Sequence, residues 1–407
     1  MRVLYLCHRI PYPPNKGDKI RAFHQLQAIA ARHEVDLFTL ADDAADMAHQ
    51  STLRGYCRRV TVGRVRPRLA RLRVLPYLFT QVPLTVPYFY CPELQREVRK
   101  AVVARSYDCV FVYCSAMAQY VERAWRIPVV TDFVDVDSDK WVQYAALSRW
   151  PVSAVYRREG RTLQKYEQQI CDRSSCVVVT TEREASLVRQ ITRTARVHVI
   201  PNGVDTEFFK PSGQPPSGPP TVGFIGDMSY FPNEEAVTCF ARRVLPLIRQ
   251  SVPGARFLIV GRNPGRKVQK LAEMEGVEVT GLVPDIRVHL ARMHATVAPF
   301  SIAAGIQNKI LEAMAFGLPV VCTSLAARGL STETAAAIDV ADGAEEMAAK
   351  IVTLFGDMQL ARSRGMECRR RVAGEYNWTA SLSRLLELLE NPARRELSGR
   401  AACSPLL

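Results

Sequence analysis

One stretch of the sequence decides the fold: Gly305-Ile306-Gln307-Asn308-Lys309-Ile310-Leu311-Glu312, which continues as Ala-Met-Ala-Phe-Gly-Leu-Pro-Val-Val over residues 313–321. An apolar strand is expected before it at 296–298, and another within it at 320–322. Between the strands, a loop of small residues leads into a segment whose apolar residues recur at helical spacing. Strand, loop, helix and strand in this order form the repeating unit of a parallel sheet flanked by helices.

The same alternation continues along the whole chain. In the C-terminal half, strands are also expected at 221–225, 257–260 and 277–280, with helices at 233–250, 267–275, 285–293, 309–315 and 344–354. In the N-terminal half, strands are expected at 3–7, 35–40, 60–62, 109–113, 128–132, 176–180 and 198–200, with helices at 20–31 and 153–171. We therefore predict an α/β fold of two Rossmann-like, doubly wound domains that face each other across a cleft.

The stretch PSGQPPSGPP at residues 211–220 separates the two halves. Its prolines and glycines disfavour both helix and central strand, so we expect a hinge there. This places the N-terminal domain at residues 1–210 and the C-terminal domain at 211–375. In open parallel sheets, ligands bind beyond the carboxyl ends of the strands, which makes the cleft between the domains the expected active site.

The composition is that of a soluble globular protein, with 48% hydrophobic and 23% charged residues in a chain of 407. The apolar run at the N-terminus is too short for an export signal, and no uncharged apolar stretch reaches the ~20 residues of a membrane-spanning helix. The 11 cysteines include no C-x-x-C pair, which favours reduced cysteines in the cytoplasm. The histidines form no metal-ligand spacing, so no metal site is predicted.

The net charge of +14 is concentrated in the first half, where 32 Lys and Arg face 21 Asp and Glu in residues 1–210. Five arginines lie within residues 64–73, and an apolar and aromatic run follows at 75–90. This combination favours an anionic membrane surface or a phosphate-bearing substrate. A solvated basic helix over ordinary core aromatics is the equally weighted alternative. The arginines are not interleaved with an RNA-binding motif, so no nucleic-acid partner is predicted.

The helix expected after Gly305 begins where a diphosphate could bind, because free backbone N–H groups and the helix dipole attract anions. Lys309 in the first turn would oppose that dipole, which makes sense if a bound phosphate offsets its charge. Glu312 lies on the same side of the helix and could accept hydrogen bonds from a vicinal diol such as ribose. The alternative is a solvated Lys–Glu pair beside a simple turn at Gly305.

Several motifs resemble retaining GT-B glycosyltransferases of family four. They are IPNGVDTEFF at 200–209, GFIGDM at 223–228, IVGRNP at 259–264, VTGLVPDI at 279–286 and EAMAFGLPVV at 312–321. The stretches PYPPNKGDKIR at 11–21 and GIQNKILEAMA at 305–315 are most similar to the sugar transferases associated with exosortase/PEP-CTERM exopolysaccharide systems. The resemblance implies that a helix at 376–391 crosses back to the first domain, and residues 392–407 are expected to be a disordered tail.

The resemblance also implies roles for individual residues at the donor site. Glu312 would hold the ribose, and Lys309 with the amides of Gln307 and Asn308 would hold the diphosphate. The remaining donor-binding residues would be Gly226, Asp227, Gly261, Arg262, Asp285, Gly305 and Ile306. Two departures stand out: Ala304 replaces a sugar-contacting Glu, and Met228, Ser229 and Asn233 stand where the family has Arg and Lys. We expect Lys309, aided by Arg262, to take over the missing positive charge.

Two segments of the first half are candidates for the opposite side of the cleft. Asp135 follows an expected strand, where family members often have a sugar-contacting His; the alternative is that the Asp cluster caps the next helix. The acceptor-side loop is expected at Gly17, Asp18, Lys19 and Arg21, with Lys19 or Arg21 pairing with a phosphate. Here the alternative is a helix cap at Asp18.

The sequence thus predicts a retaining hexosyltransferase that uses a UDP- or GDP-sugar and neither a metal nor another cofactor. The expected acceptor is a growing exopolysaccharide, a glycan or polyprenyl-diphosphate-linked chain, at the cytoplasmic face of the inner membrane. Two alternatives on the same fold are a non-catalytic nucleotide-sugar-binding protein and a nonhydrolysing sugar-nucleotide epimerase. The sugar, the nucleotide base and the acceptor are not determined by the sequence.

Overall fold

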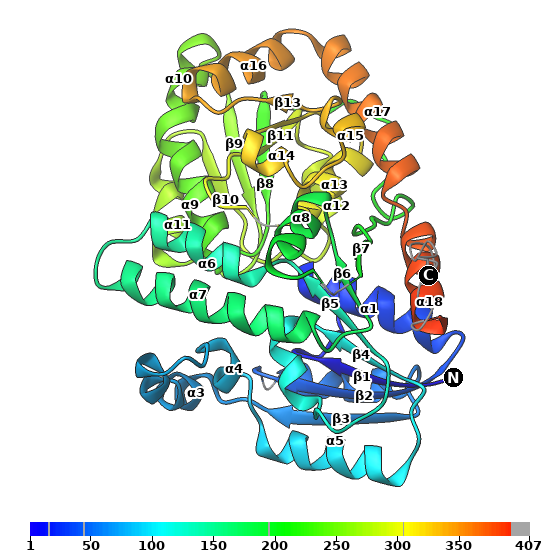
Figure 1. The fold of residues 1–407 in the computed structure, drawn as a ribbon. Helices are drawn as coiled ribbons and strands as arrows, with labels where there is room; N and C mark the ends of the chain where they lie inside the picture. The colour runs from blue at the N-terminus through cyan, green and yellow to red at the C-terminus, as the bar shows by residue number, and fades with distance from the viewer. Residues whose placement is uncertain (15–16, 44, 194–195, 304, 392–407) are drawn as a thin grey trace, which may run out of the picture.

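The computed structural model describes residues 1–14, 17–43, 45–193, 196–303 and 305–391, and it confirms the predicted α/β fold (Figure 1). Within these ranges the first sheet has seven parallel strands in the order β3-β2-β1-β4-β5-β6-β7. Its strands are β1 (Arg2–Cys7), β2 (Glu34–Ala41), β3 (Arg59–Arg64), β4 (Cys109–Tyr113), β5 (Val129–Val134), β6 (Cys176–Val179) and β7 (Val197–Val199). The strand order reverses between β1 and β4, and at such a switch point the carboxyl ends of the strands form a crevice.

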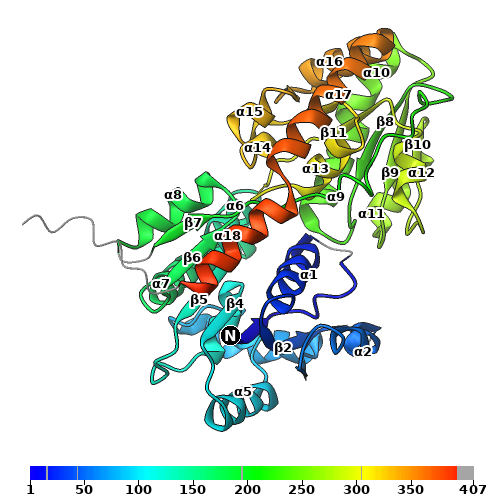
Figure 2. The ribbon, with the colours of Figure 1, turned by 90° about the vertical axis from the view of Figure 1, so that its right-hand side faces the viewer.

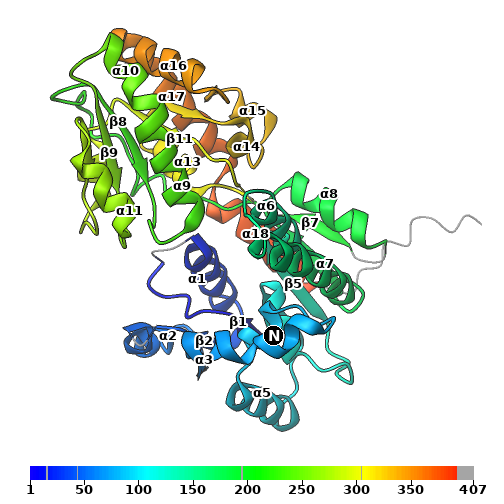
Figure 3. The same cartoon turned by 90° about the vertical axis from the view of Figure 1, so that its left-hand side faces the viewer.

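Helices cover the first sheet on both faces, as its continuously apolar strands require. The helices are α1 (Gly17–Ala30), α2 (Gln50–Leu53), α3 (Pro67–Arg73), α4 (Thr85–Tyr88), α5 (Pro92–Ala104), α6 (Asp137–Ala146), α7 (Val152–Cys171) and α8 (Glu182–Ile191). Short 3₁₀ turns are η1 (Ala45–His49), η2 (Leu75–Phe79) and η3 (Ser115–Tyr120). Figures 2 and 3 show α1 below the second sheet, on the side of the first domain that faces it.

The second sheet has six parallel strands in the described part of the chain, in the order β10-β9-β8-β11-β12-β13. They are β8 (Thr221–Ile225), β9 (Arg256–Val260), β10 (Val277–Val279), β11 (Ala295–Ala298), β12 (Val320–Cys322) and β13 (Asp339–Val340). The flanking helices are α9 (Phe231–Cys239), the π-helical turn η4 (Phe240–Val244), α10 (Leu245–Ser251), α11 (Arg266–Gln269), η5 (Lys270–Glu273), α12 (Ile286–Leu290), α13 (Asn308–Ala315), α14 (Ser324–Ala327), α15 (Thr332–Ala335) and α16 (Ala344–Gly356). Its switch point lies between β8 and β11.

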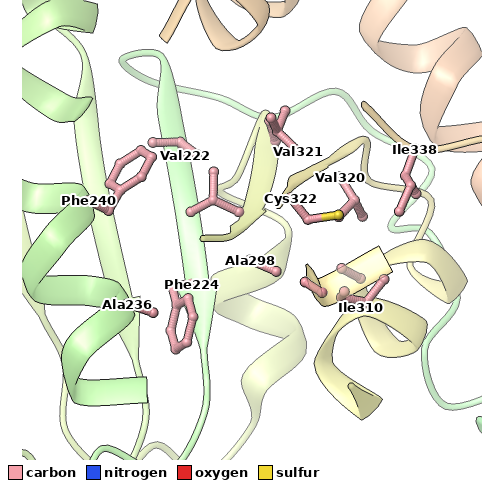
Figure 4. Packing of buried hydrophobic residues seen from close by; sticks show 14 of the residues in the cluster. Val222, Phe224, Ala236, Phe240, Ala298, Ile310, Val320, Val321, Cys322 and Ile338 are labelled. Carbon is pink, nitrogen blue, oxygen red and sulfur yellow. The ribbon is translucent and has the colours of Figure 1, made fainter. Parts of the chain in front are cut away.

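The core of the second domain fixes the helix that carries the candidate site. Figure 4 shows Phe224 of β8, Ala298 of β11 and Ile310 of α13 in one buried cluster, which also contains residues of α9 and β12. Ile310 and Leu311 are each 1% exposed. Burying two such side chains stabilises the attachment by roughly 3–6 kcal/mol, and it turns the side of α13 that carries Lys309 toward the end of β8.

Two segments connect the domains. The chain first crosses between β7 and β8, and it returns between α17 (Met358–Glu375) and α18 (Trp378–Glu390). The two crossings are hydrogen-bonded to each other, since Val204 N donates to the Tyr376 carbonyl oxygen at 2.9 Å. Figure 2 shows α18 lying along the first domain, and Leu385 and Leu389 are buried in the core that α1 and β1 share. Every helix in the described ranges is too short or too polar to cross a membrane.

The helix expected at 233–250 is interrupted, and this is the clearest local difference from the sequence prediction. Pro246 at the second position of α10 has no N–H group to continue the hydrogen-bond ladder, so the turn before it widens into η4. The helices α5, α6, α8 and α17, the strand β13 and the short helices α2, α4, α14 and α15 were also not expected from the sequence. The tail at 392–407 and two residues of the N-terminal loop, Asn15 and Lys16, lie outside the described residues.

Candidate active site

The candidate donor site lies at the switch point of the second sheet, where α13 begins. Gln307 occupies the N-cap position of α13, and its side chain does not cap the helix. Asn308 faces the first domain: a Cβ atom at Gly17 of α1 would lie 3.5 Å from Asn308 Nδ2. The N-terminus of α13 and the start of α1 therefore meet where the two domains face each other.

Lys309 is a largely buried cation with weak internal compensation. Its Nζ donates a hydrogen bond to Asn233 Oδ1 at 2.5 Å and lies 4.6 Å from the ring centroid of Phe300. Burial lowers the pKa of Lys309 to about 7, although the carboxylates of Glu312 and Asp227 oppose the shift. No carboxylate among the described residues forms an ion pair with it. An anion bound at α13 would restore the full charge of the ammonium group.

Glu312 lies one turn along the same side of α13 and is also half-buried. Burial raises the pKa of Glu312 to about 7, and the charge of Lys309 limits the shift. In the ranges that the structure describes, no group donates a hydrogen bond to its carboxylate. The side chain is therefore an available acceptor beside the anion site, which is the geometry that recognition of a ribose diol needs.

The ends of β8 and β9 close the other side of this site. A Cβ atom at Gly261 would lie 1.6 Å from the carbonyl oxygen of Gly226, so only glycine permits these two turns to pack together. A Cβ atom at Gly226 would lie 3.4 Å from Lys309 Nζ, which puts this turn next to the cation. Asp227 and Arg262 form an ion pair at 2.9 Å.

Two residues expected at this side of the site also have partners within the second domain. Arg262, which is expected to assist Lys309 with the diphosphate, donates from Nε to Asp227. Asp285, which is expected to border the nucleotide, caps α12 by accepting a hydrogen bond from Arg287 N at 2.9 Å and pairs with the same arginine's side chain. Both residues have local structural partners because each lies where a strand leads into a helix.

Asp135 lies against Gly305, in the segment between β11 and α13. A Cβ atom at Gly305 would come within 1.9 Å of Asp135 Oδ1, and the φ angle of Gly305, 55°, also favours glycine. Burial raises the pKa of Asp135, while the nearby Lys140 ammonium opposes the shift. Val136, and not Asp135, is the N-cap residue of α6. The structure therefore brings Asp135 and Gly305 together across the cleft, and the capping alternative does not apply to this carboxylate.

The acceptor-side loop differs from its prediction. Lys19 and Arg21 were expected to face a phosphate, but both are buried in ion pairs within the first domain. Lys19 Nζ lies 2.7 Å from Asp46 Oδ1, and Arg21 Nη2 lies 2.8 Å from Asp132 Oδ2. Neither cation is free, because a carboxylate from a neighbouring loop or strand neutralises each one. Asp18 pairs with Arg9 at 2.8 Å.

Three residues of this region were not expected from the sequence to belong to the site. Glu184 of α8 accepts hydrogen bonds from Val136 N at 2.6 Å and Gly305 N at 3.5 Å, and burial raises its pKa. Asn202 contacts Asn308 across the domains, with Nδ2 to Oδ1 at 2.8 Å. Asn233, noted only as a departure from the family pattern, is the partner of Lys309. The Pro-Asn-Gly turn at 201–203 was the only local signal for Asn202.

Ala304, where the family pattern has a sugar-contacting Glu, lies outside the described residues. Across the described ranges, no three His, Cys, Asp or Glu side chains are grouped as a metal site would require. The described site thus consists of the N-terminus of α13 with Lys309, the carboxylate of Glu312 beside it, and two carboxylates of the first domain, Asp135 and Glu184, against Gly305.

Two doubly wound domains that face each other, with a helix beginning at the switch point of the second sheet, have the GT-B architecture. A family model described as Glycosyltransferase Family 4 matches residues 20–208, and one described as Glycosyl transferases group 1 matches residues 219–357. Together the matches include every strand of the second sheet and all strands of the first except β1. The chain belongs to this family of GT-B glycosyltransferases, as the sequence motifs predicted.

Solved structures of two other proteins share the fold over almost the whole chain. Sucrose-phosphate synthase from Thermosynechococcus elongatus superposes with a TM-score of 0.72 and 19% identity, covering 96% of this chain and 99% of that one. HepE from Anabaena, in complex with UDP, superposes with a TM-score of 0.69 and 18% identity, covering 96% and 100%. At these identities the likeness extends to the fold.

A curated relative from Arabidopsis thaliana is similar over a shorter region. It is one of the subunits of phosphatidylinositol N-acetylglucosaminyltransferase, and it is 30% identical over 177 residues, which is 40% of this chain. The match spans 36% of that relative's length.

Proposed function

We propose that this protein transfers a hexose from a UDP- or GDP-sugar to a growing, lipid-linked exopolysaccharide, with retention of anomeric configuration and without a metal or other cofactor. The proposal rests on two neighbouring side chains at the N-terminus of α13. Among the described residues, no carboxylate forms an ion pair with Lys309, and no group donates a hydrogen bond to the carboxylate of Glu312. In this proposal residues 1–210 bind the acceptor and residues 211–375 bind the donor.

At the donor side, the amides of Gln307 and Asn308 and the ammonium of Lys309 bind the diphosphate, and Glu312 binds the ribose. Cleavage of the glycosidic bond places additional negative charge on the leaving diphosphate. Preorganised N–H groups and a buried cation stabilise that charge more strongly than they stabilise the substrate, which lowers the barrier. HepE, which shares the fold, has been solved with UDP and with UDP-glucose, and this supports a nucleotide-sugar donor.

At the acceptor side, Asp135 accepts hydrogen bonds from the hexose, and Gly17 with Asp18 borders the incoming hydroxyl group. The departing diphosphate takes up the proton of that hydroxyl. Closure of the domains about residues 201–220 excludes water and aligns the reacting atoms. In this proposal Asp135 binds hydroxyl groups of the hexose and does not attack its anomeric carbon, so transfer is direct and not a double displacement.

A lipid-linked acceptor is supported by an exposed surface on the first domain. The side chains of Leu69, Leu72 and Leu75 are more than half exposed, and Phe79 is 94% exposed. The arginines around them are exposed as well, at positions 64, 66, 68, 71 and 73. Apolar side chains among arginines suit the boundary of an anionic bilayer, so we place the protein at the cytoplasmic face of the inner membrane. The name of the Arabidopsis relative likewise includes a phospholipid, phosphatidylinositol.

The donor experiment uses purified protein, a panel of UDP- and GDP-sugars, and a bacterial lipid extract. We expect release of free nucleotide only when both the correct donor and lipid are present, with a lipid product one hexose heavier by mass spectrometry. The product linkage, determined by NMR, should keep the anomeric configuration of the donor. Binding without release indicates a binding protein, and a changed nucleotide sugar without acceptor indicates an epimerase; either result refutes the transferase proposal.

The membrane experiment is co-sedimentation with vesicles of phosphatidylcholine alone or of phosphatidylcholine containing about one third phosphatidylglycerol, an anionic lipid. We expect binding only to the anionic vesicles, and Phe79→Ser should reduce it. Val103→Ser is the matched control, because Val103 is 90% exposed and lies on α5, outside the arginine-rich segment at 64–73. Equal binding to both vesicle types, or an equal effect of the two substitutions, would exclude this surface as the membrane contact.

A further inference from the structure

A buried chain of polar side chains connects the two domains beneath the candidate site. It begins at Asn308, the first residue of α13, whose Oδ1 accepts a hydrogen bond from Asn202 Nδ2 at 2.8 Å. Asn202 lies in the crossing segment between β7 and β8 and is only 5% exposed. The first residue of α13 is therefore hydrogen-bonded to the crossing segment about which the two domains would move.

Arg21 continues the chain into the first domain. Its Nη1 donates to Asn202 Oδ1 at 2.9 Å, and its Nε donates to Asp132 Oδ2 at 2.9 Å. Arg21 and Asp132 are both fully buried, and Gln25 donates to the same carboxylate oxygen at 2.6 Å. Dehydrating an ion pair is expensive, and well-packed apolar residues often stabilise a core equally well. The pair is therefore better explained by its directional hydrogen bonds than by stability alone.

Asp132 ends the chain by holding a strained turn. Its Oδ1 accepts a hydrogen bond from Val134 N at 2.8 Å, and Val134 has a φ angle of 66°. A β-branched residue in this left-handed conformation costs about 1–3 kcal/mol and persists only where surrounding contacts enforce it. Asp135 N closes the turn on the Phe133 carbonyl oxygen at 2.8 Å. The turn directs the carboxylate of Asp135 toward Gly305.

Both ends of this hydrogen-bonded chain therefore meet the segment that leads into α13, at Gly305 through Asp135 and at Asn308, the first residue of the helix, through Asn202. The chain draws on both domains and on the crossing segment, so it is complete only when the domains are arranged as in this structure. We propose that Arg21 and Asn202 are positioning residues that couple the N-terminus of α13 to the placement of Asp135. This inference rests on the proposed function in one respect, namely that Asp135 contacts the transferred sugar.

The first test is hydrogen exchange, measured by mass spectrometry on the unliganded full-length protein. Asn202→Ala removes both of its contacts and leaves the Arg21–Asp132 pair in place. We expect faster exchange in peptides covering residues 132–137 and 305–312, and unchanged exchange in α16. Thr334→Val is the control, because Thr334 is fully buried and bonds to Glu375 outside this chain. Unchanged exchange at 132–137 in the Asn202 variant would overturn the coupling, whether or not the protein is a transferase.

The second test is kinetic. Two lost hydrogen bonds of roughly 1 kcal/mol each correspond to a fall of about 10–30-fold in kcat, and KM for the donor should change less than about threefold. In an Asp135→Asn background, Asn202→Ala should have little further effect, because the group it positions is already impaired. Asn202→Asp should recover most of the activity, since the Asn308 amide can rotate and donate to it. Additive losses, or a change confined to KM, would contradict a positioning role.

The two proposals fail in different ways. If the native protein transfers no sugar from any donor, the proposed function is refuted, and hydrogen exchange still decides whether the chain couples the domains. If the native protein is active and Asn202→Ala is as active as the native protein, the positioning role is refuted and the transferase assignment stands.

Discussion

Replacing Lys309 with Met tests the charge at the donor-site helix with little change in shape. The aliphatic part of the side chain would still pack against Phe224 and Phe300, whose ring centroids lie 4.9 and 4.6 Å from Nζ. Because burial lowers the pKa of Lys309 to about 7, the folded protein already disfavours this charge. The Lys309→Met protein is therefore expected to be at least as stable as the native protein and to lose activity.

The size of the loss follows from the role of the ammonium group. At about 4 Å, a cation and a phosphate oxygen attract each other by about 4 kcal/mol at an effective dielectric constant of ~20. Part of this is offset by dehydration, and the loss of one preorganised donor to a developing anion typically lowers kcat by about 10²–10³-fold. Since the diphosphate gains charge as the bond breaks, kcat should fall more than the affinity for the donor.

The assay combines initial rates of nucleotide release over a range of donor concentrations with a thermal melt of each variant. Lys350→Met is the control, because Lys350 is a surface lysine of α16 that pairs with Glu346 of the same helix. A Lys309→Met protein with a native Tm and a kcat within about threefold of the native value would refute the reasoning. So would a strong fall in Tm, since the charge would then stabilise the fold.

Three further predictions concern the same groups. The pKa of Glu312 is raised from 4.5 to about 7, so between these pH values the folded protein binds more protons there than the unfolded chain does. The free energy of unfolding therefore falls as the pH rises from 4.5 to 7. The pKa of Lys309 is lowered from 10.5 to about 7, so above pH 7 the unfolded chain binds more protons there and the free energy of unfolding rises with pH. Denaturant titrations at a series of pH values should thus show a minimum in the free energy of unfolding near pH 7, and the Lys309→Met Glu312→Gln protein should lack it. A minimum that persists in this double variant would refute the assignment of the pH dependence to these two residues. Asp135→Asn should lower kcat by about 10²-fold. In the native protein, kcat should fall at acid pH with an apparent pKa above the usual range of carboxylates, and the variant should lose this dependence. An unaltered pH–rate profile would show that Asp135 is not the group that titrates. Arg21→Met leaves Asp132 buried without its cation, so the free energy of unfolding of the first domain should fall by about 3–5 kcal/mol. Arg21→Met Asp132→Leu should recover part of this loss. Native stability of the single variant would contradict a structural role for the buried ion pair.

The fold was predictable because its signals are local. Parallel strands buried on both faces are continuously apolar, and helices between them have their own period, so both sheets can be traced from short windows of sequence. Some of the elements that were missed carry weak local signals. β13 has only two residues, and α6 begins within an Asp-rich stretch that also suggests a turn. The π-helical turn before Pro246 arises from a single residue inside an otherwise helical pattern.

The candidate site was predictable only in part, for a related reason. A helix N-terminus after a strand is a local pattern, so Lys309 and Glu312 could be selected from the sequence. The partners of Arg21 could not, since Asp132 lies 111 residues away and Asn202 lies 181 residues away. Charged residues in a loop suggest a ligand when their partners are unknown. On that basis Lys19 and Arg21 were predicted to bind the acceptor, whereas in the folded protein each forms an ion pair with a buried or half-buried aspartate.

The sequence and the structure together suggest which domain supplies the carboxylate that contacts the hexose. The family pattern places a sugar-contacting carboxylate in the second domain, and this chain has Ala304 there. The structure brings two carboxylates of the first domain, Asp135 and Glu184, against Gly305. A carboxylate supplied across the cleft can contact the sugar only while the domains are closed. In the proposed transferase, recognition of the correct sugar would then be coupled to closure and to exclusion of water, so a donor that fails to engage Asp135 would not stabilise the closed state.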